Sequence, residues 1–206
     1  MAVVKALGIL ISGRGSNLQA IIDAVADGSL DARIAVVISN RAGAGGLERA
    51  ARAGIETRVL PHREYPTRED YDQALAREFR QCRVDLVCLA GFMRLLSATF
   101  VEVFPHAILN VHPSLLPAFP GVDAQRQALE HGVKVTGATV HLVTAELDGG
   151  PIIVQAPVPV LAEDTVENLS ARILAEEHRI YPEAIATVLR GGWRIDGRRF
   201  VPGGIE

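Results

Sequence analysis

Three residues of this sequence have side chains suited to acid–base chemistry at one centre. Asn110 and His112 lie two residues apart at the end of an apolar run, and Asp148 follows further along the chain. Side chains two apart on a strand point to the same side, so Asn110 and His112 would face one cleft. An amide donor beside an imidazole suits a developing oxyanion, and a nearby carboxylate would favour the protonated imidazole. Spacing alone leaves the alternative that Asp148 belongs to a turn and that His112 is a surface residue.

A glycine-rich loop near the start of the chain is a candidate anion site. Gly13 and Gly15 would let the backbone turn tightly, and a helix that follows them would present free amide groups to a phosphate. Leu18 occupies the place of the third glycine of a dinucleotide fingerprint, and no acidic residue ends the second strand, so NAD is disfavoured. A single phosphate on a small ligand fits better. The alternative is a tight turn with Ser16 or Asn17 as the helix N-cap.

Apolar runs alternate with segments of helical period in the first half of the chain. The runs are nearly continuous, which is typical of strands buried on both faces of a parallel sheet. The rhythm predicts an α/β fold with a doubly wound, mostly parallel sheet and a Rossmann-like N-terminal half. We predict strands at 3–11, 34–38, 57–60, 86–90 and 108–111, and helices at 17–27, 47–53, 67–80 and 97–104.

The sequence of the second half of the chain predicts antiparallel strands added to this sheet. A proline-punctuated loop after residue 112 precedes a helix at 124–131, and β-runs at 137–143 and 152–160 could pair as a hairpin. A long helix at 166–190 contains Pro182, which we expect to kink or split it. A terminal hairpin at 194–201 would turn at Asp196 and Gly197. We interpret residues 1–206 as one domain.

Composition narrows the function classes. The 206 residues are 49% hydrophobic and 22% charged with a net charge of -3, which argues against disorder and against a nucleic-acid partner. Cys82 and Cys88 do not make a metal cluster or a disulfide framework, and we expect Cys88 to be buried. The N-terminal apolar run is too short for a membrane span and does not read as a signal peptide. We expect a cytoplasmic monomer or homodimer without a membrane or nucleic-acid partner.

Five motifs stand in order along the chain, and together they resemble the folate-dependent formyltransferases. The first and the last motif are similar to the branch of that family that acts on glycinamide ribonucleotide. The resemblance implies formyl transfer from 10-formyltetrahydrofolate to the amine of glycinamide ribonucleotide, in de novo purine biosynthesis and without a metal. The motifs are Ser12–Gln19, Phe92–Leu96, Asn110–Pro117, Leu147–Pro151 and Glu177–Pro182.

The resemblance also implies roles for individual residues. Asn110, His112 and Asp148 would be catalytic, within a phosphate-binding half at about 1–105 and a folate-binding half at about 106–206. The loop Thr144–Asp148 would close the pterin pocket, and the Leu116–Pro117 bond would be cis. The phosphate of glycinamide ribonucleotide would be bound by Gly15, Ser16 and Asn17, and its ribose hydroxyls by Glu177. The folate would be bound by Arg68, Met93, Arg94, Leu95, Leu96 and Asn110.

Several of these residues have simpler alternatives. Leu95 and Leu96 could be core, and Arg68 could pair with Asp72 one helical turn away. Glu177 could be one exposed acid among several. We expect a buried supporting role rather than catalysis for His141 in mid-strand, and Arg14 and Leu174 depart from residues common in relatives, which leaves their ligand contacts open.

Three rival functions remain. Methionyl-tRNA formyltransferase shares the Asn-x-His and Asp motifs but carries an added C-terminal nucleic-acid-binding domain, for which we expect no room after residue 206. Formyltetrahydrofolate deformylase carries an extra N-terminal domain, whereas the first strand here is expected from Val3. A catalytically silent nucleotide-binding module would keep the glycine loop but would not need the Asn, His and Asp together.

Overall fold

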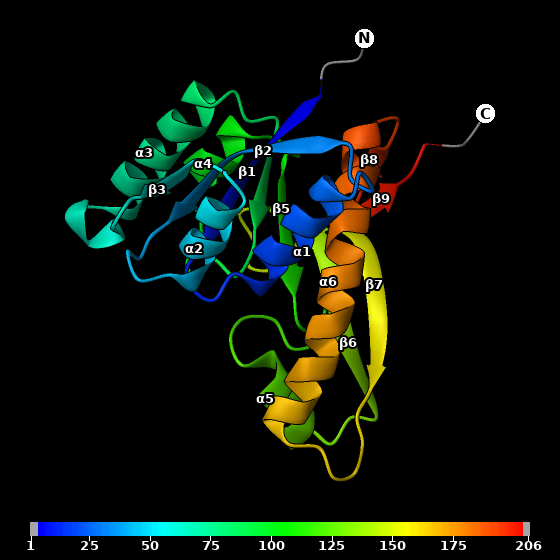
Figure 1. Ribbon diagram of the computed structural model, residues 1–206. Helices are drawn as coiled ribbons and strands as arrows, with labels where there is room; N and C mark the ends of the chain where they lie inside the picture. Colours follow the sequence, from blue (N-terminus) through cyan, green and yellow to red (C-terminus); the bar gives the residue numbers. More distant parts are fainter. Residues whose placement is uncertain (1–3, 204–206) are drawn as a thin grey trace. The chain divides into compact units, whose positions relative to one another are not determined.

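The computed structural model describes residues 4–203, whose contacts divide into two compact units (Figure 1). The first unit is Met1–Leu109 and the second is Asn110–Glu206. Strand β5 (Ile108–His112) runs across the boundary in the chain. Within the part of the chain that is described, no helix has the length and apolarity needed to cross a membrane.

The first unit contains a parallel sheet with strand order β3-β2-β1-β4. The predicted strands and helices are confirmed, with ends that differ by one or two residues, and a short 3-10 helix was not predicted. Val3, the predicted start of the first strand, lies outside the described residues. The elements are β1 (Lys5–Ile11), α1 (Ser16–Ala26), β2 (Ala32–Ser39), α2 (Gly45–Arg52), β3 (Thr57–Val59), η1 (His62–Glu64), α3 (Arg68–Gln81), β4 (Leu86–Leu89) and α4 (Ala98–Val103).

Helices cover both faces of this sheet, as a doubly wound fold requires. A Cβ atom on Gly8 of β1 would lie 2.6 Å from the ring of Phe79 on α3. On the other side, a Cβ atom on Gly46 of α2 would lie 2.6 Å from Ile11 Cδ1. Gly8 and Ile11 are an odd number of positions apart, so they point to opposite faces of the strand. α1 packs with α2 and α3 packs with α4, and β1 is buried on both faces.

The second unit carries the antiparallel additions, with strand order β5-β6-β7-β9-β8. β6 pairs antiparallel with β7, and β8 pairs antiparallel with β9, so both predicted hairpins are confirmed. β9 joins β7 in parallel, with Ile152 opposite Arg199. The remaining elements are α5 (Ala124–Glu130), β6 (Val135–Leu142), β7 (Ile152–Pro159), α6 (Val166–Arg190), β8 (Arg194–Asp196) and β9 (Arg199–Val201).

Helix α6 is continuous across Pro182, so of the predicted kink or split the split is wrong, and the kink stays a prediction. A proline inside a helix removes one backbone hydrogen bond and costs about 3 kcal/mol. The packing of α6 offsets this cost, because the helix lies along β6 and β7 (Figure 1). Buried side chains occur on both sides of the proline, among them Ile173 and Ile185.

Candidate active site

Strand β5 places Asn110 and His112 on one side of the sheet, as their spacing predicts. Val111 between them is buried towards the other side. His112 is buried and Asn110 is half-buried. The strand therefore presents an amide and an imidazole together.

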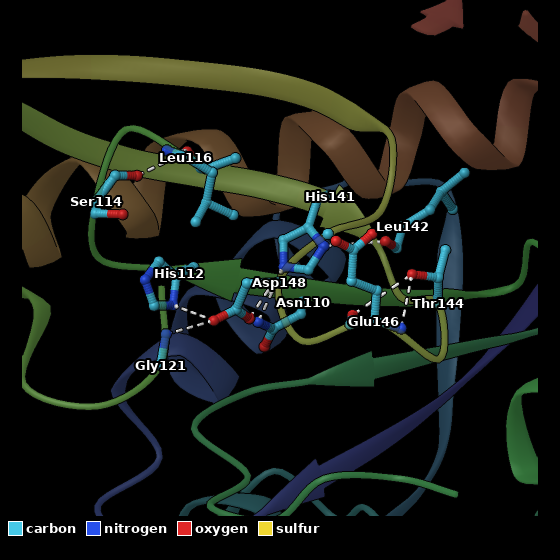
Figure 2. Close-up of polar contacts among 12 residues, drawn as sticks. Asn110, His112, Ser114, Leu116, Gly121, His141, Leu142, Thr144, Glu146 and Asp148 are labelled. Carbon is cyan, nitrogen blue, oxygen red and sulfur yellow. Dashed lines mark hydrogen bonds and ion pairs between the residues drawn. The ribbon is translucent and has the colours of Figure 1, made fainter. Parts of the chain in front are cut away.

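Asp148 lies between two histidines of the second unit, and Figure 2 shows its carboxylate directed at both rings. Its Oδ2 is 3.5 Å from His112 Nδ1, and its Oδ1 is 3.7 Å from His141 Nε2. The backbone N–H of Gly121 donates to Oδ2 at 2.8 Å. The structure thus brings together Asn110, His112 and Asp148, which sequence spacing alone left apart.

The surroundings of Asp148 keep its carboxyl group ionised. Burial raises the pKa of this carboxyl, but the opposing contacts are stronger and hold the pKa below the ordinary 3.8. These contacts are the hydrogen bond of His141, the Gly121 N–H and the positive charge of His112 and His141. At neutral pH a buried negative charge therefore faces the two imidazoles.

His112 has an acceptor beside each ring nitrogen. Nε2 lies 2.8 Å from the carbonyl oxygen of Phe119, and a carbonyl can only accept, so this nitrogen carries a hydrogen. Nδ1 faces the Asp148 carboxylate, which a neutral ring would approach with a lone pair and an imidazolium with a second N–H. An imidazolium here would present an N–H to each of these acceptors, and it is the form that can stabilise an oxyanion.

His141 orients the carboxamide of Asn110. Its Nδ1 donates to the carbonyl of Leu142 at 3.0 Å. Its Nε2 lies 3.2 Å from Asn110 Nδ2 and 3.7 Å from Asp148 Oδ1, so the ring contacts both groups. His141 is buried, so the expected supporting role fits its position. The sequence signal was the pair of polar residues Thr139 and His141, two positions apart on one side of an apolar strand.

Thr139 holds the loop that follows His112. Its hydroxyl donates to the carbonyl of Ser114 at 2.7 Å and accepts from the N–H of Leu116 at 3.1 Å. Gln155 Nε2 donates to the carbonyl of Leu116 at 2.9 Å. The Leu116–Pro117 bond in this loop is cis, which confirms that prediction. Strands β6 and β7 therefore fix the backbone beyond the histidine.

The glycine loop of the first unit is shaped by a close approach of two helices. The N-cap of α1 is Gly15, with φ of 73°, so the prediction of Ser16 or Asn17 as N-cap is wrong. A Cβ atom at Gly15 would lie 2.5 Å from the Cα of Gly46 at the start of α2. The N–H of Gly46 donates to the carbonyl of Gly13 at 3.1 Å. Both the backbone conformation and the space available therefore require glycine at position 15.

A cavity of about 280 Å³ opens at this loop. Gly15, Ser16 and Asn17 line it at the N-terminus of α1, where backbone amides and the helix dipole favour an anion. Arg14 and Arg41 also line the cavity, and both are exposed. Sequence reasoning overlooked Arg41, although its place just after β2 is where ligands of parallel sheets bind. The charge around this cavity suits an anionic group such as a phosphate.

Arg68 is the first residue of α3 and is exposed to solvent. Its guanidinium pairs with Glu69 at 3.4 Å. Asp72 instead accepts from the backbone N–H of Ser97 at 2.5 Å, so the alternative that Arg68 forms its ion pair with Asp72 is wrong. Arg68 is therefore available to a ligand at the cost of one exposed ion pair.

The segment from Met93 to Leu96 lies largely at the surface. Met93 is 66% exposed and Leu95 is 56% exposed, so the alternative that Leu95 is core is wrong. Leu96 is half-buried. Arg94 stacks over the ring of Tyr71, with its Cζ 5.3 Å from the ring centroid. Exposed apolar side chains beside Arg94, which is held by the ring of Tyr71, suit a flat aromatic ligand that carries a negative charge at one end.

Glu177 on α6 is only 7% exposed, so the alternative of an ordinary exposed acid is wrong. Its neighbour Glu176 instead points outward and pairs with Arg179 at 2.7 Å. A carboxylate is costly to bury without partners, so Glu177 serves a specific contact rather than solubility. Leu174 is half-buried and Arg14 is exposed, and nothing in the described structure assigns either a ligand.

Within residues 4–203, no group of three or more His, Cys, Asp or Glu side chains is arranged to hold a metal ion. Cys88 is buried, as predicted. The absence of a metal from the reaction stays a prediction.

Comparison with known proteins extends this picture. A family model described as formyl transferase matches residues 5–185, which include the glycine loop, Asn110, His112 and Asp148. The chain belongs to the formyl transferase family. The family model covers residues of both compact units, so its match does not depend on one motif alone.

Relatives in this family match over nearly the whole chain. Phosphoribosylglycinamide formyltransferase of Escherichia coli is 50% identical over 190 residues, covering 92% of this chain and 87% of that protein. A crystal structure of glycinamide ribonucleotide transformylase 1 from Symbiobacterium toebii is 58% identical with a TM-score of 0.96, covering 98% of this chain and 95% of that one. This likeness confirms the predicted fold class.

Longer relatives contain a segment like this chain. The human trifunctional purine biosynthetic protein adenosine-3 is 50% identical over 185 residues, which are 90% of this chain. The chain spans only 18% of the length of that protein, and 14% of the length of its Drosophila melanogaster counterpart.

Proposed function

We propose that this chain is a phosphoribosylglycinamide formyltransferase. Formyl transferases of this family take the formyl group from a folate-derived donor, and we propose 10-formyltetrahydrofolate here. The products are formylglycinamide ribonucleotide and tetrahydrofolate, in de novo purine biosynthesis. The observation that carries the proposal is His112 held between the Phe119 carbonyl and the Asp148 carboxylate, beside Asn110.

The reaction begins when the primary amine of glycinamide ribonucleotide attacks the formyl carbon. A tetrahedral intermediate forms with negative charge on the formyl oxygen. Asn110 Nδ2 and the protonated His112 donate hydrogen bonds to this oxygen. His112 Nδ1 lies 3.5 Å from Asp148, longer than a charge-assisted hydrogen bond of about 2.8 Å, so this N–H retains capacity for a second acceptor.

Asp148 accepts the proton that the attacking amine loses and passes it on. The attacking amine becomes positively charged, and the ionised carboxylate accepts its proton through water. The proton then passes to N10 of the folate as the carbon–nitrogen bond breaks, so tetrahydrofolate leaves neutral at that atom. Asp148 also holds His112 cationic while charge develops on the oxygen.

Binding roles complete the proposal, each for a separate residue. The amides of Gly15, Ser16 and Asn17 bind the phosphate of the acceptor, supported by the cavity at the start of α1. Glu177 binds the ribose hydroxyls, supported by its burial. The loop Thr144–Asp148 closes the pterin pocket. The folate contacts belong to Arg68, Met93, Arg94, Leu95, Leu96 and Asn110.

One assay separates this proposal from its rivals. Purified protein is mixed with 10-formyltetrahydrofolate and glycinamide ribonucleotide, and the folate product is followed by absorbance. We expect turnover that requires the nucleotide. Donor hydrolysis without an acceptor would indicate a deformylase, formylation of methionyl-tRNA would indicate the tRNA enzyme, and no turnover would indicate a silent binding module. Cytoplasmic location and the monomer or homodimer state stay predictions.

A further inference from the structure

The loop that carries Asp148, residues 144–150, holds its aspartate in an unfavourable backbone conformation. Asp148 has φ of 48°, in the left-handed region that non-glycine residues avoid. Such conformations are unfavourable and persist only when the surroundings fix them. Two glycines follow, and the second of them has no room for a side chain because it lies against the backbone of Leu142. A Cβ atom at Gly149 would lie 2.4 Å from Glu146 Cδ, and one at Gly150 would lie 1.8 Å from the Leu142 oxygen.

The hydrogen bonds inside this loop are long. The N–H of Glu146 donates to the Thr144 hydroxyl at 3.3 Å, and that hydroxyl donates to the Glu146 carbonyl at 3.5 Å. The N–H of Gly149 donates to the same carbonyl at 3.3 Å. Hydrogen bonds at these distances are weak, since the usual N–H···O distance is about 2.9 Å. Contacts from outside the loop must therefore help to fix Asp148.

Arg198 supplies such contacts on both sides of Asp148. Its Nη2 donates to the carbonyl of Gly149 at 2.7 Å, the shorter of its two bonds. Its Nη1 lies 3.4 Å from Glu146 Oε2. A planar guanidinium can serve two acceptors at once, which a lysine ammonium cannot do with the same geometry.

Arg198 lies on a hairpin whose backbone is attached close to the loop. Arg198 lies in the turn between β8 and β9, directly before Arg199. Arg199 pairs with Ile152 at the start of β7, two residues beyond the loop. The hairpin is thus attached by its backbone where the loop ends, and Arg198 reaches back over the loop from that anchor.

We propose that Arg198 is a positioning residue for Asp148: it clamps the Gly149 carbonyl and so keeps the carboxylate against Gly121 and the two histidines. The proposal rests on the formyl-transfer function proposed above. Arg198 touches no reacting atom and acts through the backbone of the loop. When the clamp is removed, the loop can relax its left-handed residue, and the carboxylate moves away from the N–H and the rings that keep it ionised.

The expected effects follow from the exposure of this contact. The Arg198 side chain is 71% exposed, so its ion pair contributes little to global stability and the folded chain should tolerate its loss. We expect Arg198→Ala to lower kcat by about 3- to 10-fold, consistent with losing one charged hydrogen bond screened by solvent. The KM for the folate should rise as well, because the same loop closes the pterin pocket. The KM for glycinamide ribonucleotide should not change.

The experiment compares Arg198→Ala with Arg194→Ala and Arg198→Lys by steady-state kinetics across pH. Arg194 is an exposed arginine of the same hairpin and, among the described residues, makes no hydrogen bond or ion pair to the loop. We expect Arg194→Ala to match the wild type and Arg198→Lys to recover part of kcat. The acid limb of the kcat profile should move to higher pH in Arg198→Ala, which a uniform loss of folded protein would not produce. An Arg198→Ala enzyme with the kinetics and pH profile of Arg194→Ala would overturn the proposal.

Amide hydrogen exchange separates this inference from the proposed function. If the wild type shows no formyl transfer, the proposed function fails, and exchange across residues 144–150 still tests the clamp. Faster exchange in Arg198→Ala than in Arg194→Ala would support the clamp. Equal exchange in the two variants would refute it, whether or not the wild type is active.

Discussion

The glycine loop of the first unit and the Asp148 cluster of the second unit are built by different means. Backbone conformation and helix packing fix the glycine loop, where Gly15 lies against Gly46 of α2. Side-chain charge and hydrogen bonds fix the cluster, where Asp148 faces His112 and His141. The first region should therefore be sensitive to added atoms and the second to changed charge.

The largest test of this contrast is Asp148→Asn, which keeps the shape of the side chain and removes its charge. We expect kcat to fall by about 1,000-fold or more, because the proton acceptor and the counter-charge of His112 are lost together. The KM values should change only modestly. Glu163→Gln, at an exposed acid, is the control. Wild-type turnover by Asp148→Asn would remove this residue from the mechanism.

Asn110→Ala should have the next largest effect. It deletes one donor to the oxyanion and, by the usual cost of such a donor, should lower kcat by about 100- to 1,000-fold. His141→Ala should cost less, since His141 gives no hydrogen bond to the oxyanion and acts through Asn110 and Asp148, which remain. Kinetics of both variants check this order, and a larger loss in His141→Ala than in Asn110→Ala would reverse the assignment of their roles.

Gly15→Ala tests the region fixed by backbone. The added methyl group meets Gly46 and the residue keeps a positive φ, so we expect the KM for glycinamide ribonucleotide to rise by about 10-fold or more, from about 1–3 kcal/mol of strain at the phosphate amides. Gly28→Ala is the matched control, because Gly28 has φ of 79° but open space around its Cα. If both variants raised this KM equally, the helix contact would have no part in binding.

The smallest effect concerns stability at low pH. The pKa of Asp148 is lowered on folding, so its ionised form stabilises the folded state above about pH 4, near the ordinary pKa of an aspartate. That contribution is lost as the pH falls through the folded-state pKa, which lies below 3.8. The difference in thermal midpoint between the wild type and Asp148→Asn should thus be constant above pH 5 or so and shrink in more acidic solution. A difference that grows on acidification would contradict the direction of the shift.

Local sequence patterns predicted the parts of the molecule that depend on local physics. Continuous apolar runs predicted the buried parallel strands, and Thr67 predicted the start of α3, where its hydroxyl accepts from Asp70 N–H. The period of two on β5 predicted that Asn110 and His112 share a side. Each of these follows from neighbours in the chain.

Such local patterns could not predict contacts between residues that are far apart in the sequence. Nothing near Asp148 in the sequence indicates that its carboxylate reaches His112, 36 positions earlier, because only the folded sheet brings β5 and the loop together. The burial of Glu177 and the continuity of α6 across Pro182 depend on the packing of that helix, and the N-cap at Gly15 depends on the approach of α2. Arg198 carried no local signal at all.

The loop after His112 touches both members of the ion pair through its main chain. The carbonyl of Phe119 accepts from His112, and the N–H of Gly121 donates to Asp148. Both atoms belong to the main chain of one short segment, so inserting or deleting one residue would shift both at once. The spacing between them therefore depends on the number of residues as well as on the positive φ of Phe119 and Gly121, which makes loop length a quantity to preserve when this chain is recombined or redesigned.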